Sequence, residues 1–376
     1  MALALTGARV FDGEHFTGEQ TVIVEGGHIK TLVPGGGVPE SIERRDLGGG
    51  ILAPGFIDIQ VNGGGGALLN ATPDVACVRT IAASHRAFGV TGLLPTVITD
   101  APEVIRAAID AVQAARDQRV PGVLGIHIEG PFIDVSRKGA HDPRFIRRLT
   151  DTDVEEIASA RCGKVMVTLS PRQTDATQIA RLVEAGVAVS LGHSDATYNE
   201  AMAALKAGAT AFTHLYNAMS QMAGREPGMA GAAISDRDSF VSVIADGFHV
   251  HDAAMQVALA VKRRGRMMLI SDAMPPAAGG PDVFHLQGRE IRRVEGKLTL
   301  ADGTLAGSNL TMDAAVRYCV TKLRIDVARA LRMASLAPAM FLKLDGELGR
   351  IAPGFRANLV HLDDNLAVKQ SWIDGT

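Results

Sequence analysis

Eight short apolar runs alternate with amphipathic segments through the middle of the chain. Between most of the runs, apolar residues recur every three or four positions, as on one face of a helix, and Gly often ends the pattern. Near-continuous apolar strands joined by helical crossovers are typical of a parallel sheet. The alternation favours an α/β fold of the (β/α)8 TIM-like barrel type. An open doubly wound sheet is the alternative, although no GxGxxG follows the first run to support a dinucleotide fold. The runs lie at 55–61, 91–98, 123–129, 165–170, 188–193, 210–215, 241–246 and 267–272.

Both ends of the chain lack this alternation and contain short β patterns with Gly-rich turns. We expect residues 1–54 and 346–376 to pair into one small β-sandwich domain, with two independent decorations as the alternative. Residues 55–345 would then form the barrel, with a β-hairpin insertion at about 285–305.

Composition excludes several classes of protein. The net charge of -3 gives no electrostatic basis for binding nucleic acid or a membrane surface. The three cysteines are scattered and form no CxxC motif, which favours a reducing compartment. The chain start lacks the pattern of a signal peptide, and the apolar stretches are far too short to span a membrane. We therefore expect a cytoplasmic protein with neither a nucleic-acid nor a membrane partner.

Four widely separated polar residues stand where apolar runs end. They are Glu129, His193, His214 and Asp272, at the ends of the third, fifth, sixth and eighth runs. The active site of a β/α barrel lies at the C-terminal ends of its strands, so these side chains should converge. A carboxylate and two imidazoles suit Zn²⁺ and leave a position open for water, whose pKa the metal lowers to about 7. Asp272 beside that water could accept its proton and pass it to a leaving amine.

Each of these residues also has an ordinary structural interpretation. A buried His is usually a satisfied core residue, and an Asp at a strand end is often a helix N-cap. Their common position at equivalent strand ends favours the metal site. His127 shares a strand face with Glu129 but lies one layer deeper, so we interpret it as a supporting or core residue.

Longer motifs surround these residues and cover nearly the whole chain. Together they resemble the N-acetylglucosamine-6-phosphate deacetylases, a family of the amidohydrolase superfamily. The main motifs are PGFIDIQVNGGGG (54–66), HIEGPF (127–132), KGAH (138–141), LGHSDA (191–196), THLYNAM (213–219), ADGFHV (245–250), SDAM (271–274) and LAGSNLTM (305–312).

The resemblance implies a catalytic role for five positions. Glu129, His193 and His214 would hold one divalent metal ion per subunit, with Zn²⁺ expected before Fe²⁺, Co²⁺ or Mn²⁺. Asp272 would serve as the general base and then as the general acid. His141 would hydrogen-bond the acetyl carbonyl and polarise it.

The resemblance also implies the substrate contacts. His249 and Arg225 would bind the 6-phosphate, with Arg225 coming from the neighbouring subunit of a homodimer. The other implied contacts, near the phosphate or along the sugar pocket, are Ala140, His141, Asn217, Ala218, Leu305, Ala306 and Gly307.

One position departs from the wider superfamily. Many amidohydrolases carry His-x-His at the end of the first strand, where it binds a second metal. Here Gln60 and Asn62 occupy the equivalent places. Neutral amides are poor zinc ligands, so we expect a single tightly bound metal.

The resemblance implies a metal-dependent hydrolase that converts N-acetyl-D-glucosamine 6-phosphate to D-glucosamine 6-phosphate and acetate in amino-sugar catabolism. One alternative is a deacetylase of N-acetylgalactosamine 6-phosphate or another N-acyl amino sugar. The other is a non-catalytic amidohydrolase-like scaffold, against which the complete Glu, His, His and Asp set argues.

Overall fold

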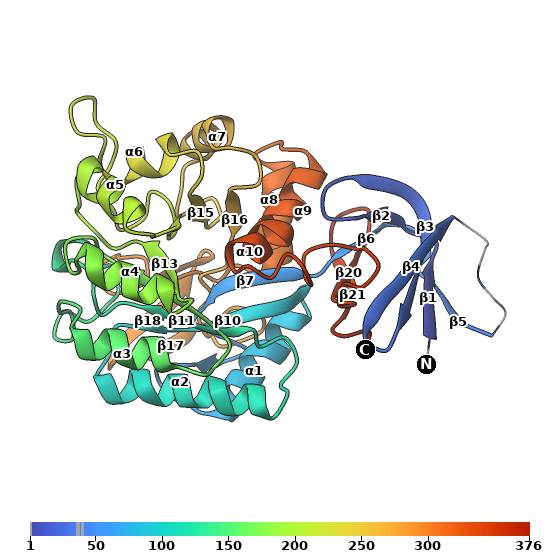
Figure 1. The fold of residues 1–376 in the computed structure, drawn as a ribbon, viewed down its shortest axis with the longest axis horizontal. Helices are drawn as coiled ribbons and strands as arrows, with labels where there is room; N and C mark the ends of the chain where they lie inside the picture. The colour runs from blue at the N-terminus through green and yellow to red at the C-terminus, as the bar shows by residue number, and fades with distance from the viewer. Residues whose placement is uncertain (1, 35–37, 39–40) are drawn as a thin grey trace.

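The computed structural model describes residues 2–34, 38 and 41–376. Its two largest sheets have eight strands each, and they lie in separate parts of the molecule (Figure 1). Among the helices of these residues, none combines the length and apolarity needed to span a membrane.

One of these sheets is a nearly closed parallel barrel. Its strands are hydrogen-bonded in chain order, and each neighbouring pair is parallel. A parallel bridge between Val61 and Ala273 joins the first strand to the chain beyond the last. The (β/α)8 barrel expected from the sequence is confirmed. Its strands are β7 (Phe56–Val61), β10 (Val90–Ile98), β11 (Gly125–Glu129), β12 (Lys164–Leu169), β13 (Ala188–Leu191), β14 (Ala211–Phe212), β15 (Phe240–Val243) and β16 (Met267–Leu269).

Helices follow most of these strands, and local chemistry sets where several of them begin. Thr150, Asp175 and Thr197 each form a capping box, in which the cap side chain and the third helical residue satisfy each other's free backbone N–H. Five helices occupy segments with the expected period: α1 (Val75–Arg86), α2 (Pro102–Asp117), α4 (Ala176–Glu184), α5 (Tyr198–Lys206) and α7 (Asp252–Val261). The others are α3 (Asp151–Ser159), α6 (Gly228–Ser235), α8 (Met312–Thr321), α9 (Val327–Ala334) and α10 (Leu336–Phe341).

The second large sheet contains both ends of the chain. β20 pairs antiparallel with β6, which joins the C-terminal hairpin to the N-terminal strands. Both termini therefore lie in the same part of the molecule, away from the barrel helices (Figure 1). The expected small β domain built from both chain ends is confirmed as a separate sheet domain. Its strands are β1 (Ala2–Thr6), β2 (Arg9–Phe11), β3 (Phe16–Glu25), β4 (His28–Pro34), β5 (Glu43–Asp46), β6 (Ile51–Pro54), β20 (Leu359–Leu362) and β21 (Val368–Trp372).

We propose domain boundaries near residues 55 and 346. The first rests on the end of β6 at Pro54 and the start of β7 at Phe56. The second boundary assigns the loop before β20 to the terminal sheet domain, because Ile351 and Ala357 in that loop pack into the apolar core of the sheet.

An antiparallel insert lies between β16 and α8. It has three strands, β17 (Val283–Leu286), β18 (Arg289–Val294) and β19 (Lys297–Thr299), where the sequence predicted a hairpin. The additional strand β17 buries Phe284 and Leu286 while its alternate residues are exposed. These side chains pack with Ile98, Ala140 and Met274, which lie at the C-terminal end of the barrel. A short hairpin of β8 (Gly63–Gly64) and β9 (Ala67–Leu68) follows the first barrel strand.

Candidate active site

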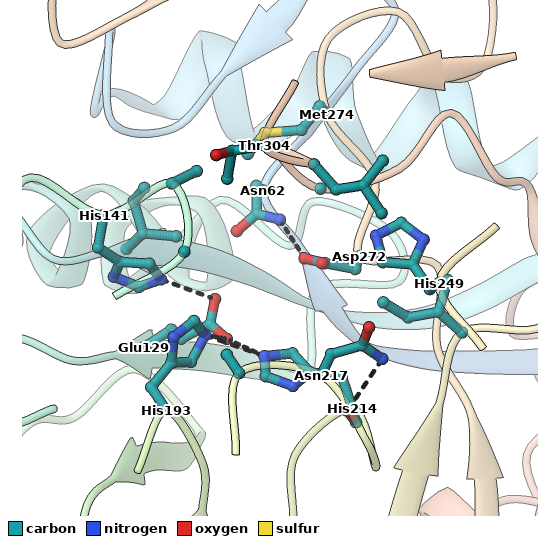
Figure 2. A pocket seen from close by; sticks show the side chains of 17 residues that line it. Asn62, Glu129, His141, His193, His214, Asn217, His249, Asp272, Met274 and Thr304 are labelled. Atoms are coloured by element: carbon teal, nitrogen blue, oxygen red, sulfur yellow. Dashed lines mark hydrogen bonds and ion pairs between the residues drawn. The ribbon is translucent and has the colours of Figure 1, made fainter. Parts of the chain in front are cut away.

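The four polar residues that follow barrel strands converge in one pocket. Glu129 ends β11, while His193, His214 and Asp272 lie two or three residues beyond β13, β14 and β16. Their exposed fractions are only 2%, 5%, 3% and 9%. They line a pocket of about 240 Å³ and point toward its interior (Figure 2). The structure thus brings together residues up to 143 positions apart, from Glu129 to Asp272.

Backbone conformation directs three of these side chains. His193, His214 and Asp272 have φ angles of 47°, 34° and 50°, in the left-handed region that residues other than Gly rarely adopt. Hydrogen bonds to adjacent strands hold two of them there: the His214 N–H donates to Ser242 Oγ at 2.8 Å, and the Asp272 N–H donates to the Gln60 carbonyl at 3.0 Å. The barrel therefore maintains a conformation that these residues would avoid in isolation.

Glu129, His193 and His214 direct three ligand atoms at one point. The two imidazole Nε2 atoms lie 3.0 Å apart, and they lie 3.3 Å (His193) and 3.1 Å (His214) from Glu129 Oε1. His193 Nδ1 lies 2.8 Å from the Arg137 carbonyl, which can only accept a hydrogen bond. That bond places the proton on Nδ1 and leaves the Nε2 lone pair facing the cluster.

The electrostatics of this cluster fit a cation. Burial acts to raise the pKa of Glu129, but its contacts with His193 and His214 hold that pKa well below its usual range. An ionised carboxylate and two imidazole nitrogens, all buried, form the donor set of a catalytic site for a borderline divalent metal. The residues present therefore fit a metal ion.

Asp272 is held beside this cluster by two side-chain amides. Gln60 Nε2 donates to Glu129 Oε1 at 2.9 Å and to Asp272 Oδ1 at 3.2 Å, and Asn62 Nδ2 donates to the same Asp272 oxygen at 2.8 Å. Burial and the charge of Glu129 raise the pKa of Asp272 to about 6, against the opposing effect of His214. A carboxyl group with such a pKa suits proton transfer near neutral pH.

His141 lies on the other side of the ligand cluster. Its ring centroid is 4.4 Å from that of His193, and its Nε2 is 3.9 Å from Glu129 Oε2. The Thr99 hydroxyl, 2.7 Å from His141 Nδ1, orients the ring. Burial and the proximity of His193 hold the pKa of His141 well below its usual range, so the ring is neutral.

Most of the remaining predicted substrate contacts also line the pocket, and three predicted residues do not. Gln60 and Ala306 are fully buried behind the pocket wall. Arg225 is exposed on the loop before α6 and lies outside the pocket of its own chain. The predicted residues that line the pocket are Asn62, Ala140, Asn217, Ala218, His249, Leu305 and Gly307.

The sequence analysis missed several lining residues: Ile98, Gly139, Ile244, Met274 and Thr304. Met274 ends the SDAM motif (271–274) that contains Asp272, so that motif could have identified it. Thr304 follows the insert and carries no periodic signal that would direct it to the pocket.

His127 lies in the barrel interior, outside the ligand cluster. Its Nε2 is 2.8 Å from Thr168 Oγ1, and its Nδ1 is 3.3 Å from Thr96 Oγ1. Burial lowers its pKa to about 4, so the ring is neutral. Both ring nitrogens are thus occupied by hydroxyl partners.

Comparison with known proteins agrees with this geometry. A model described as the amidohydrolase family matches residues 51–376, and one described as the NagA composite domain matches residues 3–52. The chain belongs to the amidohydrolase family. The family match covers the whole barrel, including all four converging residues.

Similar proteins include deacetylases of two phosphosugars. An N-acetylgalactosamine-6-phosphate deacetylase of Shewanella sp. (strain ANA-3) is 43% identical over 88% of this chain and 83% of its own length. The N-acetylglucosamine-6-phosphate deacetylase of Homo sapiens is 38% identical over 89% of this chain and 84% of its own length.

Solved structures of such enzymes share the fold over the full chain. The N-acetylglucosamine-6-phosphate deacetylase of Pasteurella multocida superposes with a TM-score of 0.97 at 32% identity, covering 100% of this chain and 99% of the other. A mutant of the Mycobacterium smegmatis enzyme, in complex with N-acetyl-D-glucosamine-6-phosphate, superposes with a TM-score of 0.90 at 34% identity, covering 100% and 98%.

Proposed function

We propose that this protein is a metal-dependent hydrolase that removes the acetyl group from N-acetyl-D-glucosamine 6-phosphate, releasing D-glucosamine 6-phosphate and acetate. The observation that carries the proposal is the buried cluster of Glu129, His193 and His214 facing Asp272 in one pocket. The relatives named as N-acetylglucosamine-6-phosphate deacetylases supply the substrate class. The reaction would belong to amino-sugar catabolism, and we place it in the cytoplasm because all three cysteines are free and buried.

The roles of the pocket residues follow from their chemistry. One divalent cation per subunit, Zn²⁺ in the first instance, would be held by Glu129, His193 and His214, where it would acidify a water molecule and polarise a carbonyl. Asp272 would accept the proton of the attacking water and return it to the departing amine. His141 would hydrogen-bond the acetyl oxygen from the opposite side of the cluster.

The far side of the pocket would bind the phosphosugar. His249 and Asn217 lie on the side of the pocket beyond Asp272 (Figure 2) and would bind the phosphate end together with Ala218, which also lines the pocket. Leu305 and Gly307 would border the sugar ring, and Ala306 between them anchors that segment through its N–H bond of 3.0 Å to the Leu298 carbonyl.

The proposal predicts acetate release from phosphorylated N-acetyl sugars. Loss of the charge-assisted bonds to the phosphate should lower kcat/KM for unphosphorylated N-acetylglucosamine by about 100-fold or more, since each such bond contributes about 1.5–3 kcal/mol. The measurement is acetate release with phosphorylated and unphosphorylated N-acetylglucosamine. If the metal-loaded protein releases no acetate from either sugar, the result would instead support a non-catalytic scaffold.

N-acetylgalactosamine 6-phosphate is the second candidate substrate. Two of the relatives, 43% and 38% identical, are named as deacetylases of this epimer. Comparing kcat/KM for the two 6-phosphates decides between them: a higher value for the glucosamine epimer supports the first candidate, and a higher value for the galactosamine epimer supports the second.

We further propose a homodimer in which Arg225 reaches the partner's pocket. Arg225 is exposed and lies outside the pocket of its own chain, so it is available to a neighbouring subunit. Arg225→Ala should raise KM for the phosphosugar about tenfold, because one charge-assisted bond is lost, while kcat changes little.

A subunit-mixing experiment tests whether Arg225 acts in trans. Mixed dimers of Arg225→Ala and the inactive Asp272→Asn variant contain one pocket with both an intact Asp272 and a partner that supplies Arg225. Activity with the normal KM should therefore reappear on mixing. A monomer by light scattering, or no change in KM for Arg225→Ala, would contradict the arrangement.

A further inference from the structure

Asp246 lies directly behind His249, in the turn that follows β15. Asp246 Oδ2 is 2.7 Å from His249 Nδ1. Its other oxygen, Oδ1, accepts the backbone N–H groups of Phe248 at 2.8 Å and His249 at 3.0 Å. One carboxylate thus folds the turn and also fixes the imidazole.

The Asp246 and His249 side chains are buried, and the turn contacts α8 at Gly247. The two side chains are only 9% (Asp246) and 7% (His249) exposed. Gly247 between them has φ of 77°, and a Cβ there would lie 2.6 Å from Tyr318 Oη on α8. Gly247 therefore lies close against Tyr318 of α8, and the His249 ring points toward the pocket (Figure 2).

The Asp246 carboxylate also requires a proton on Nδ1 of the His249 ring. Burial acts to raise the pKa of Asp246, but its hydrogen bonds and charge interaction with His249 keep that pKa below its ordinary value, so the group is ionised. An ionised carboxylate can only accept, so His249 Nδ1 must donate. With a substrate phosphate facing Nε2, the ring would lie between two anions, so both ring nitrogens would have to donate.

We propose that Asp246 is a positioning residue for phosphate recognition: it orients His249 by accepting from Nδ1, so that in the bound complex the ring donates from Nδ1 to Asp246 and from Nε2 to the 6-phosphate of the substrate. This inference rests on the proposed function, because it takes the anion in the pocket to be the phosphate of an N-acetylhexosamine 6-phosphate. It assigns no contact between Asp246 and the substrate.

The experiment compares Asp246→Asn with the unchanged protein. The Asn oxygen can keep the two backbone bonds, while its NH₂ group faces Nδ1 and turns His249 into a neutral Nε2–H donor. KM for the phosphosugar and the inhibition constant of inorganic phosphate should each rise about tenfold, because a charge-assisted bond becomes a neutral one. The value of kcat should stay within about twofold, and kcat/KM for the unphosphorylated sugar should not change.

Two controls separate positioning from a general structural effect. Asp236→Asn changes a carboxylate that accepts the backbone N–H groups of Asp238 at 3.2 Å and Ser239 at 2.7 Å in the turn before β15, outside the pocket lining, so it should leave KM unchanged. In a His249→Asn background, Asp246→Asn should have no further effect on KM, since the group through which it acts is gone.

The inference is overturned if Asp246→Asn leaves KM unchanged, lowers kcat equally with both substrates, or adds its full effect to that of His249→Asn. Calorimetric titration with inorganic phosphate tests Asp246 without any turnover. If the unchanged protein hydrolyses no phosphosugar, the proposed function fails, while weaker phosphate binding by Asp246→Asn would still support the role of Asp246.

Discussion

Replacing Asp272 with Asn should lower kcat by about 10²- to 10⁴-fold, the range that general acid–base catalysis contributes. The amide is nearly isosteric, and its oxygen can still accept hydrogen bonds from Gln60 and Asn62, so the pocket should keep its shape. A side-chain amide neither gains nor loses a proton in this pH range, so the proton can neither be taken from water nor returned to the amine. Steady-state kinetics with a phosphosugar measure the loss.

Two further measurements complete this test: the metal content of the Asp272→Asn protein, and the turnover of a control variant at another buried carboxylate. The Asp272→Asn protein should bind as much metal as the unchanged protein, because Glu129, His193 and His214 are intact. Asp313→Asn removes another buried carboxylate, one that pairs with Arg317 on α8 outside the pocket, and should leave kcat nearly unchanged. Near-normal turnover by Asp272→Asn would exclude Asp272 as the proton carrier.

Removing the metal with a chelator should abolish measurable turnover and lower thermal stability, and one equivalent per chain should restore both. A ligand present at a hundred times its Kd stabilises the folded state by about 2.7 kcal/mol, so the melting temperature reports binding independently of activity. One equivalent should suffice, because Gln60 and Asn62 occupy the first-strand positions, where their amides already bond to Glu129 and Asp272.

Two histidine variants test whether the metal binds in the pocket. His193→Asn should lose the metal-dependent rise in melting temperature. His361→Asn, which changes a buried histidine of the terminal sheet bonded to the Gly49 carbonyl, should keep it. A requirement for two equivalents per chain would contradict the single-metal expectation.

Much of the barrel could be predicted because its signals are local. Apolar runs of strand length, helical periods between them and Gly at helix ends are each read over a few residues. The helices that the sequence analysis did not identify include α6, which has apolar residues on every side and so shows no amphipathic period. The first strand of the insert, β17, was missed because Val283–Leu286 is short and follows a Pro- and Gly-rich stretch.

The four converging residues of the candidate site could be predicted because the ends of the strands could be predicted. Glu129, His193, His214 and Asp272 each follow an apolar run, and parallel strands place such ends at one edge. The substrate contacts came from resemblance to a known family, since no spacing rule points from His249 or Leu305 to a phosphosugar.

The sequence by itself determined the alternation of strands and helices and the residue types at the strand ends, because both depend on neighbours along the chain. Tertiary structure alone decided the contacts between distant strands. Gln60 bridges Glu129 and Asp272 across separations of 69 and 212 residues, and left-handed backbone directs three of the four converging side chains. Those features depend on strand register and barrel closure, which arise from packing of the whole chain and leave no local pattern in the sequence.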